Sequence, residues 1–106
     1  MRMWNLEVKK MCNKHLLGEH VEMHMFVGTL NKNKSVQGYL DKGLVEIHNI
    51  DKRHKTIAKE MKRRGMNHKS ELEEYDKVKL GKVNVKENEI DLTKRCKDCQ
   101  RRFANG

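Results

Sequence analysis

A stretch near the start of the chain repeats its apolar residues at the spacing of an α-helix. Side chains three and four positions apart lie on one face of a helix, so we expect a helix over residues 13–30. A second stripe at the same spacing adds an imidazole and two carboxylates, and Gly18 leaves room for a partner beside Glu22. The first stripe consists of Leu16, Val21, Met23, Val27 and Leu30, and the second of Cys12, His15, Glu19, Glu22, Phe26 and Thr29.

Two later segments show the same periodicity. We expect a second helix over residues 43–64, because Gly65 is a natural stop and basic residues suit the final turn. A third helix is expected from Asp91, which is a good N-cap, while residues 66–89 lack a clear period and are expected to be irregular. The sequence therefore predicts an all-α fold, in which residues 1–106 form a single domain of three main helices. The apolar positions are Leu44, Ile47, Ile50, His54, Ile57 and Met61, and then Leu92, Cys96, Cys99 and Phe103.

Charge dominates the composition. The chain has a formal net charge of +9, from 24 basic and 15 acidic residues, and 37% of its residues are charged. Basic side chains favour a polyanionic partner because they release counterions from phosphates, so we expect nucleic acid rather than only a well-solvated surface. Aromatic residues make up only 5%, which argues against extensive base stacking on single strands. The basic residues concentrate at Lys52, Arg53, Lys55, Lys59, Lys62, Arg63 and Arg64, and at Lys94, Arg95, Lys97, Arg101 and Arg102.

Hydropathy and cysteine content bear on the compartment. No apolar run approaches the roughly 20 residues that span a bilayer, and the first residues do not form the apolar core of a signal peptide. Three cysteines, an odd number, suit a reducing compartment better than a disulfide framework. We expect a cytoplasmic, nucleoid-associated protein of a bacterial or phage-infected cell, monomeric and without a membrane partner.

Two sets of residues are candidate metal ligands. Cys96-x-x-Cys99 has the spacing of half a structural zinc site. A second CxxC-like pair is missing, although Cys12 and six histidines lie elsewhere in the sequence. Because both thiols fall on an apolar stripe, we favour small buried core residues and no metal, with zinc and redox chemistry as the alternatives. His20 and His24 also share a helix face, but the glutamate of helical zinc peptidases does not follow His20, so hydrogen-bonded or phosphate-facing histidines are favoured.

The spaced motifs resemble the pyrimidine-dimer DNA glycosylase family of the phage endonuclease V type. The start of the chain is similar to that family's first helix, and residues 62–67 resemble the end of its second. The pair Arg95-Cys96 with Cys99 is similar to a C-terminal helix of its bacterial relatives. The N-terminal resemblance is carried by Arg2, by His15-Leu16-Leu17-Gly18-Glu19-His20-Val21-Glu22 and by Phe26.

The resemblance implies a glycosylase and AP lyase that acts on damaged double-stranded DNA without a cofactor. In that family an N-terminal α-amine is the nucleophile and a glutamate of the first helix is the acid and base. Carried over without a gap, these are Met1, which we expect to be retained because Arg2 is large, and Glu22. The expected DNA-binding residues are Arg2, His15, His20, His24, Lys62, Arg63, Arg64, Lys94, Arg101 and Arg102.

The chain also departs from that family. Arginines that flank the glutamate in the phage enzyme fall on Val21 and Met25, and the aromatic C-terminal tail is replaced by Phe103-Ala104-Asn105-Gly106. The amine chemistry is therefore expected to carry over better than the specificity for dimers. Two alternatives stay open, a non-catalytic nucleic-acid-binding regulatory protein on the same scaffold and a small zinc-dependent interaction module.

Overall fold

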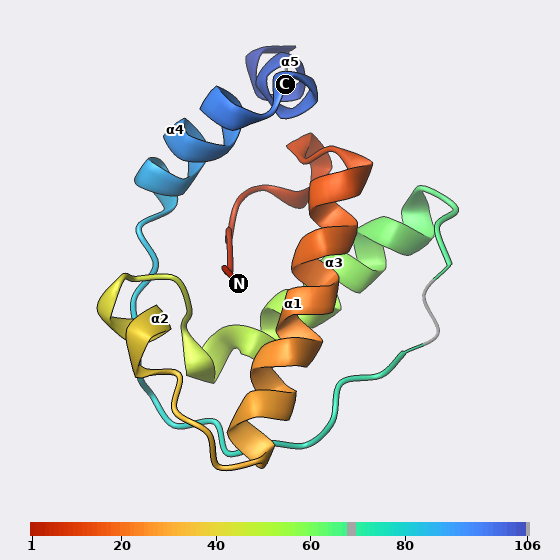
Figure 1. Cartoon of the computed structure of the whole chain (residues 1–106). Helices are drawn as coiled ribbons and strands as arrows, with labels where there is room; N and C mark the ends of the chain where they lie inside the picture. Colours follow the sequence, from red (N-terminus) through yellow and green to blue (C-terminus); the bar gives the residue numbers. More distant parts are fainter. Residues whose placement is uncertain (68–69, 106) are drawn as a thin grey trace.

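Helices make up most of the fold. The computed structural model describes residues 1–67 and 70–105, and in these residues it contains helices but no β-strands, which confirms the all-α prediction. Figure 1 shows two long helices, α1 and α3, crossing at the centre, with the remaining helices around them. The helices are α1 (Asn13–Asn31), α2 (Gln37–Asp41), α3 (Ile50–Arg63), α4 (Val85–Arg95) and α5 (Lys97–Asn105), with 3₁₀ turns η1 (Val8–Lys10) and η2 (Ile47–Asn49).

The helix α1 forms almost where its periodicity predicts. Cys12 is its N-cap, and the sulfur of Cys12 accepts a hydrogen bond from the backbone N–H of His15. The predicted apolar face is only partly correct, because Val21 is 47% exposed while Glu19 and His20 are buried. The buried face of α1 is thus rotated toward the polar stripe, and it consists of Leu16, Glu19, His20, Met23, Phe26 and Val27.

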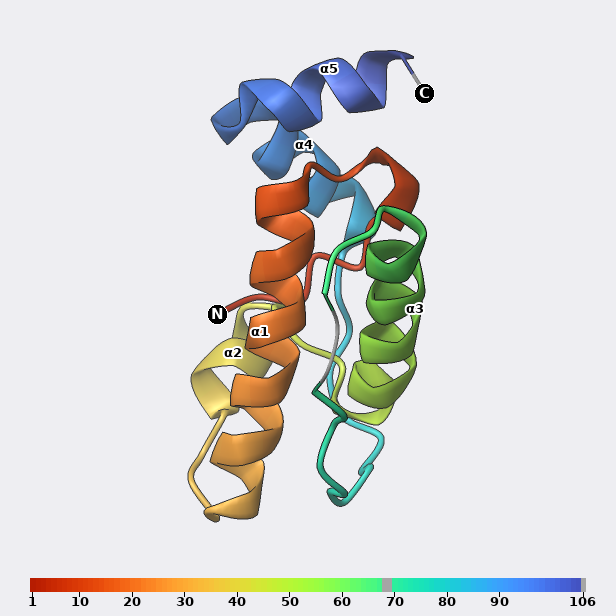
Figure 2. The ribbon, with the colours of Figure 1, turned by 90° about the vertical axis from the view of Figure 1, so that its right-hand side faces the viewer.

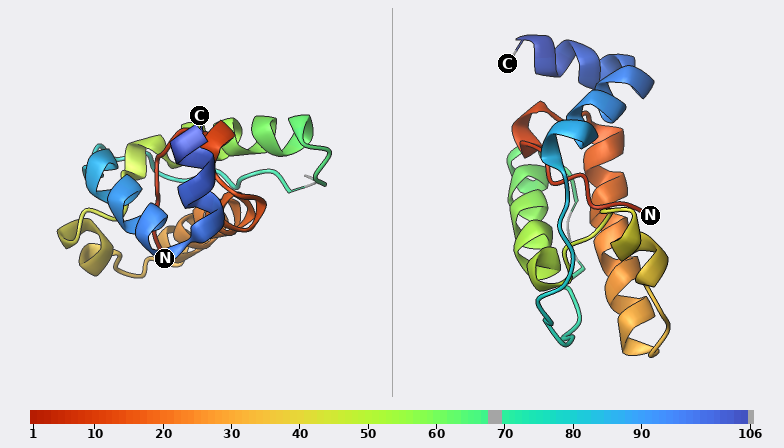
Figure 3. Two further views of the ribbon diagram at one scale, coloured as in Figure 1. Left: turned by 90° about the horizontal axis from the view of Figure 1, so that it is seen from above. Right: turned by 90° about the vertical axis from the view of Figure 1, so that its left-hand side faces the viewer.

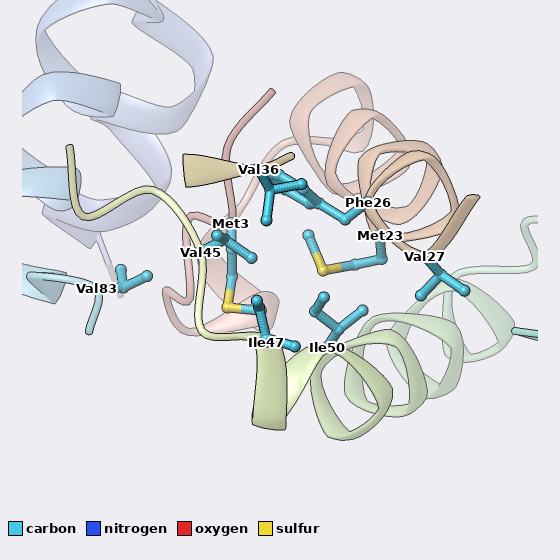
Figure 4. Close-up of a cluster of buried hydrophobic side chains, with 9 residues drawn as sticks. All are labelled: Met3, Met23, Phe26, Val27, Val36, Val45, Ile47, Ile50 and Val83. Carbon is cyan, nitrogen blue, oxygen red and sulfur yellow. The ribbon is translucent and has the colours of Figure 1, made fainter. Parts of the chain in front are cut away.

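A hydrophobic core fills the space between α1, the start of α3 and the N-terminal segment. Figure 4 shows Met3 of the N-terminal segment among side chains of α1 and of the chain around η2. Burial of an aliphatic or aromatic side chain of this size contributes roughly 1.5–3 kcal/mol. The N-terminal segment is therefore part of the core and not a loose end. The cluster contains Met3, Met23, Phe26, Val27, Val36, Val45, Ile47, Ile50 and Val83.

The helix α3 starts later than predicted. Its periodic positions from Ile47 to Met61 are buried or lie in the turn before it, but residues 43–46 are not helical. Glu46 is extended, at φ −117° and ψ 102°, because its carboxylate accepts hydrogen bonds from the backbone of Val83 and from Asn49. The predicted stop is confirmed, since Gly65 adopts φ +76° just after α3.

The predicted third helix is in fact two helices. The helix α4 already begins at Val85 because Asn84 caps it, accepting a hydrogen bond from the backbone N–H of Glu87 at 3.1 Å. The expected start at Asp91 is therefore wrong, and Asp91 lies within α4. Cys96 interrupts the predicted helix with φ −129° and ψ 113°, and α5 then runs in a new direction (Figure 2).

The connection between α3 and α4 is irregular, as predicted, apart from residues 68–69, which lie outside the described residues. Tyr75 fastens this connection to the core, because its hydroxyl donates a hydrogen bond to the carbonyl of Ile47 at 2.8 Å. Among the described residues there is no helix with the length and apolar character needed to cross a membrane.

Candidate functional site

The N-terminal segment starts beside α1 and crosses toward α3, where the backbone of Asn5 and Leu6 meets Glu19 of α1 and Arg53 of α3 (Figures 2 and 3). Hydrogen bonds to the loop after α2 and from α4 hold its first residues in place. The backbone N–H of Met3 donates to the carbonyl of Leu44 at 2.7 Å, and Asn88 of α4 donates from its side chain to the carbonyls of Met3 and Trp4 at 3.3 and 2.9 Å. Such hydrogen bonds fix the direction in which the first residue projects.

Glu22 lies beside the start of this segment. Its Oε2 accepts a hydrogen bond from the backbone N–H of Arg2 at 3.1 Å, so the carboxylate is one residue away from the α-amine of Met1. The side chain of Met1 packs partly against the core, which further limits the motion of that first residue. The structure therefore brings together the two residues that the sequence selected as catalytic.

The surroundings of Glu22 shift the pKa of its carboxyl group upward. Burial raises its pKa above the usual value, and Glu19 adds to this effect. The N–H of Arg2 and the charges of the terminal amine and of Arg2 act in the opposite direction but do not cancel the effect of burial. A carboxyl group that keeps its proton more readily than usual is suited to general acid catalysis.

Arg2 does not present a free guanidinium to a DNA backbone. Its Nη1 donates to Asp91 at 2.6 Å, and the guanidinium lies 4.4 Å from the ring centroid of Trp4. Arg95 also binds Asp91, at 2.7 Å. The sequence analysis considered Asp91 only as a helix cap and did not consider Asn88, although both lie on α4 and hold the N-terminal segment.

An ion pair beneath Glu22 supports the same segment. Glu19 and Arg53 form this pair, and their side chains are 0% and 6% exposed. Arg53 also donates to the carbonyl of Leu6 at 2.7 Å, and Glu19 accepts from the backbone N–H of Asn5 at 3.3 Å. Arg53 was expected only as one of many basic residues on the second helix, because a sequence does not reveal which charge will be paired and buried.

An open hollow of about 380 Å³ adjoins the N-terminal segment. Arg2 and residues of α4 line it, together with Lys42 after α2 and Lys82 before α4. This size falls within the range of small-molecule pockets, roughly 300–1,000 Å³. The lining is polar and carries both charges, which suits a polar group more than an apolar ligand. The lining residues are Arg2, Lys42, Gly43, Leu44, Lys82, Asn84, Glu87, Asn88 and Asp91.

The predicted DNA-contacting histidines are placed elsewhere. His20 is buried, and its ring lies 4.9 Å from that of His24 and 4.8 Å from that of His54, measured between centroids. Nε2 of His24 lies 3.1 Å from Nε2 of His54. The ligand atoms of these three histidines lie within 4.8 Å of one another, one ligand short of a closed zinc site. His15 lies with the three cysteines instead.

The predicted basic residues divide into exposed and structural ones. Lys62, Arg63, Lys94 and Arg101 are exposed, whereas the side chain of Arg64 is only 10% exposed. Arg64 binds Glu60 at 2.7 Å and donates to the carbonyl of Val8 at 2.9 Å, so its position favours a role in the fold over a phosphate contact. Arg102 is half-buried with its Nε 3.5 Å from Asp98.

Comparison with known proteins confirms the family resemblance. The family model for pyrimidine dimer DNA glycosylases matches residues 1–74, which is well over half of the chain. The protein therefore belongs to the pyrimidine dimer DNA glycosylase family. No curated protein and no solved structure matches the chain. The match ends before α4 and α5, so the residues of α4 that hold the N-terminal segment lie outside it.

Proposed function

We propose that this protein is a DNA glycosylase with AP-lyase activity that acts on damaged duplex DNA through a Schiff base. Membership of the family implies a DNA substrate. The observation that carries the proposal is the hydrogen bond between Glu22 and the backbone N–H of Arg2, at 3.1 Å, because it sets a carboxyl group beside the first residue of a firmly held segment.

The nucleophile is the α-amine of Met1, retained as the first residue of the mature protein. An α-amine has a reference pKa of about 7.7–8.0 and a lysine about 10.4, so at neutral pH the α-amine is free base more often by about two orders of magnitude. Its lone pair attacks C1′ of the deoxyribose, and the bond between C1′ and the base breaks, with the electron pair leaving on the base. The sugar ring then opens, and loss of the amine proton gives the imine.

Glu22 supplies and removes protons in this sequence. Its raised pKa supports a role as the acid that protonates the ring oxygen as the ring opens. As a carboxylate it then takes a proton from C2′, and the resulting electron pair expels the 3′ phosphate by β-elimination. Taking the C2′ proton returns Glu22 to its carboxyl form, and hydrolysis of the imine with water then releases the free amine.

The surroundings support duplex DNA as the substrate. Lys42 and Lys82 lie at the hollow beside Arg2, where they are exposed and can meet phosphates. A damaged base must leave the stack before C1′ can be attacked, and the hollow is large enough for an extruded group. Next to Glu22, α1 exposes Val21 and Met25, so the recognition surface is apolar where the phage enzyme has arginines.

Borohydride trapping tests the proposal directly. Untagged protein of verified intact mass is incubated with duplexes that contain an abasic site, a cyclobutane pyrimidine dimer or neither, and the imine is reduced. We expect a covalent complex with the abasic and dimer duplexes, and peptide mapping should place the cross-link at the α-amine of Met1. A protein acetylated at its terminus is the matched control and should form none. Binding without any trapped complex, or a cross-link at a lysine, contradicts the proposal.

A further inference from the structure

A cluster of sulfur and nitrogen atoms lies where the beginning and the end of the chain meet. Cys12 and His15 come from the first turn of α1, and Cys96 and Cys99 come from the junction of α4 and α5. The ligand atoms of these four residues all lie within 4.8 Å of one another. The two pairs have the same spacing, Cys-x-x-His and Cys-x-x-Cys, so the second pair that the sequence analysis lacked is residues 12–15.

We propose that these four residues bind one structural zinc ion. The distance between two of the sulfurs fits a tetrahedral ion, because Zn–S bonds of about 2.3 Å place two sulfur ligands about 3.8 Å apart. The sulfurs of Cys12 and Cys96 are 3.9 Å apart. Zn–N bonds of about 2.0 Å place a nitrogen and a sulfur ligand about 3.6 Å apart. Nδ1 of His15 lies on either side of this value, 3.1 Å from the sulfur of Cys12 and 3.9 Å from that of Cys99.

The backbone around the cluster is arranged to stabilise thiolates. Each of the three sulfurs accepts one backbone N–H at 3.4 Å, Cys12 from His15, Cys96 from Cys99 and Cys99 from Cys12. Hydrogen bonds of this kind orient metal ligands and offset their negative charge. Three thiols packed only as apolar core residues have no need of such a matched set of donors.

A zinc site at this position also explains the break between α4 and α5. Residue 96 is neither glycine nor proline, yet its extended backbone ends α4 and sets α5 at an angle. This change of direction lets the sulfur of Cys96 approach that of Cys12, which lies 84 residues away in the chain. A single continuous helix would place Cys96 and Cys99 one turn apart on the apolar stripe, as the sequence suggested.

The donor set identifies the ion and its role. Three cysteines and one histidine are a common ligand set of structural zinc sites, and four protein ligands leave no open position for a water molecule. Zinc at this position fastens the junction of α4 and α5 to the start of α1. The same helix α4 carries Asn88 and Asp91, which hold the N-terminal segment in place. The ion would thus support the site from a distance without taking part in its chemistry.

Metal analysis of the full-length, untagged protein tests the proposal. Protein purified under reducing conditions should contain about one zinc ion per chain, and a strong chelator should lower its melting temperature. Cobalt(II) in place of zinc should give the intense visible absorption of tetrahedral thiolate coordination. Because these readouts do not depend on catalysis, they can fail while the proposed function stands, and the reverse also holds.

Variants separate this site from the other candidates. Cys96→Ser should lose the zinc, and Cys96→His, which restores a fourth ligand, should keep it. The matched control is His24→Asn in the histidine cluster, which should keep the zinc. Wild-type protein that is free of zinc after exposure to the ion contradicts the proposal without any variant. The proposal is also contradicted if the double variant Cys96→Ser with Cys99→Ser retains zinc, or if His24→Asn alone loses it. A disulfide among the three cysteines under reducing conditions would contradict it as well.

Discussion

Arg53 holds Glu19 with two hydrogen bonds, from Nε to Oε2 at 2.6 Å and from Nη2 to Oε1 at 2.9 Å, in the buried interior between α1 and α3. The same two side chains bind the backbone of Asn5 and Leu6. The pair therefore joins three parts of the chain one helical turn below Glu22. Its burial makes it sensitive to the loss of either partner, since a lone charge would then be left without compensation.

Removing the charge of Glu19 should destabilise the fold strongly. Glu19→Gln leaves the guanidinium of Arg53 buried without its counter-charge, and we expect a loss of about 3–5 kcal/mol in the free energy of unfolding. Chemical denaturation measures this change. A double variant, Glu19→Leu with Arg53→Met, should recover part of the loss because both charges are removed together. Equal stability of Glu19→Gln and wild type would show that the pair contributes little.

Glu22→Gln should lower activity and raise stability together. We expect strand cleavage to fall by about 10²-fold or more, which is typical when a general acid and base is lost. Because folding raises the pKa of Glu22, the folded protein binds more protons than the unfolded chain, and stability falls as pH rises through that interval. The variant should therefore melt higher than wild type near pH 7, and this advantage should disappear below the ordinary pKa of 4.5. Unchanged cleavage by the folded variant would remove Glu22 from the mechanism.

Asn88→Ala tests whether α4 positions the amine. The change removes three hydrogen bonds to the N-terminal segment, two that Asn88 donates to the carbonyls of Met3 and Trp4 and one that it accepts from Arg2. It leaves the two buried carbonyls unpaired, at a cost of about 1–3 kcal/mol. We expect imine trapping to fall more than DNA binding. Asn84→Ala is the matched control, because it costs about 1 kcal/mol through the cap of α4 without touching the segment. Equal trapping by the two variants would contradict a positioning role.

Charge reversal maps the face that meets DNA. Lys42→Glu and Lys82→Glu lie at the hollow beside Arg2 and should weaken binding to all duplexes, with the salt dependence reduced by about one phosphate contact each. Lys62 lies in the last turn of α3 and does not line this hollow, so Lys62→Glu should have little effect on binding (Figure 2 shows α3 beside α1). Titrations by fluorescence anisotropy at several salt concentrations measure both. If Lys62→Glu weakened binding more than Lys42→Glu and Lys82→Glu, the DNA interface would lie on α3 instead.

Gly18→Ala tests access to α1. A methyl group at this position meets no other atom within 4 Å, so the variant should be more stable by about 1 kcal/mol from helix propensity alone. If DNA approaches α1 beside Glu22, the stabilised variant should bind more weakly than wild type. Thermal melts and binding measured on the same preparation separate the two effects. Unchanged affinity would place the bound DNA away from Gly18.

Local signals in the sequence predicted the long helices well. The helix predicted over residues 13–30 and the stop at Gly65 are encoded within a few residues, and both are confirmed. The cap at Asn84 was an equally local signal that the sequence analysis missed. Burial of Glu19 against Arg53 depends on residues 34 apart, and no local pattern specifies such a pairing.

The sequence predicted the residues of the candidate site better than it predicted their contacts. The helix stripe placed Glu22 on a definite face, but only the folded chain shows that this face meets the backbone of Arg2. Cys12-x-x-His15 was visible as a spacing and was not recognised, because its partner pair lies at the opposite end of the sequence. The extended backbone at Cys96 has no signal in the neighbouring residue types.

The attachment of Asn88 to Met3 and Trp4 also has a consequence for biosynthesis. A ribosome makes the N-terminal segment first and the residue that holds it more than eighty positions later. While the chain is growing, its first residues lack this attachment. The arrangement of the proposed site is therefore complete only after α4 has been synthesised.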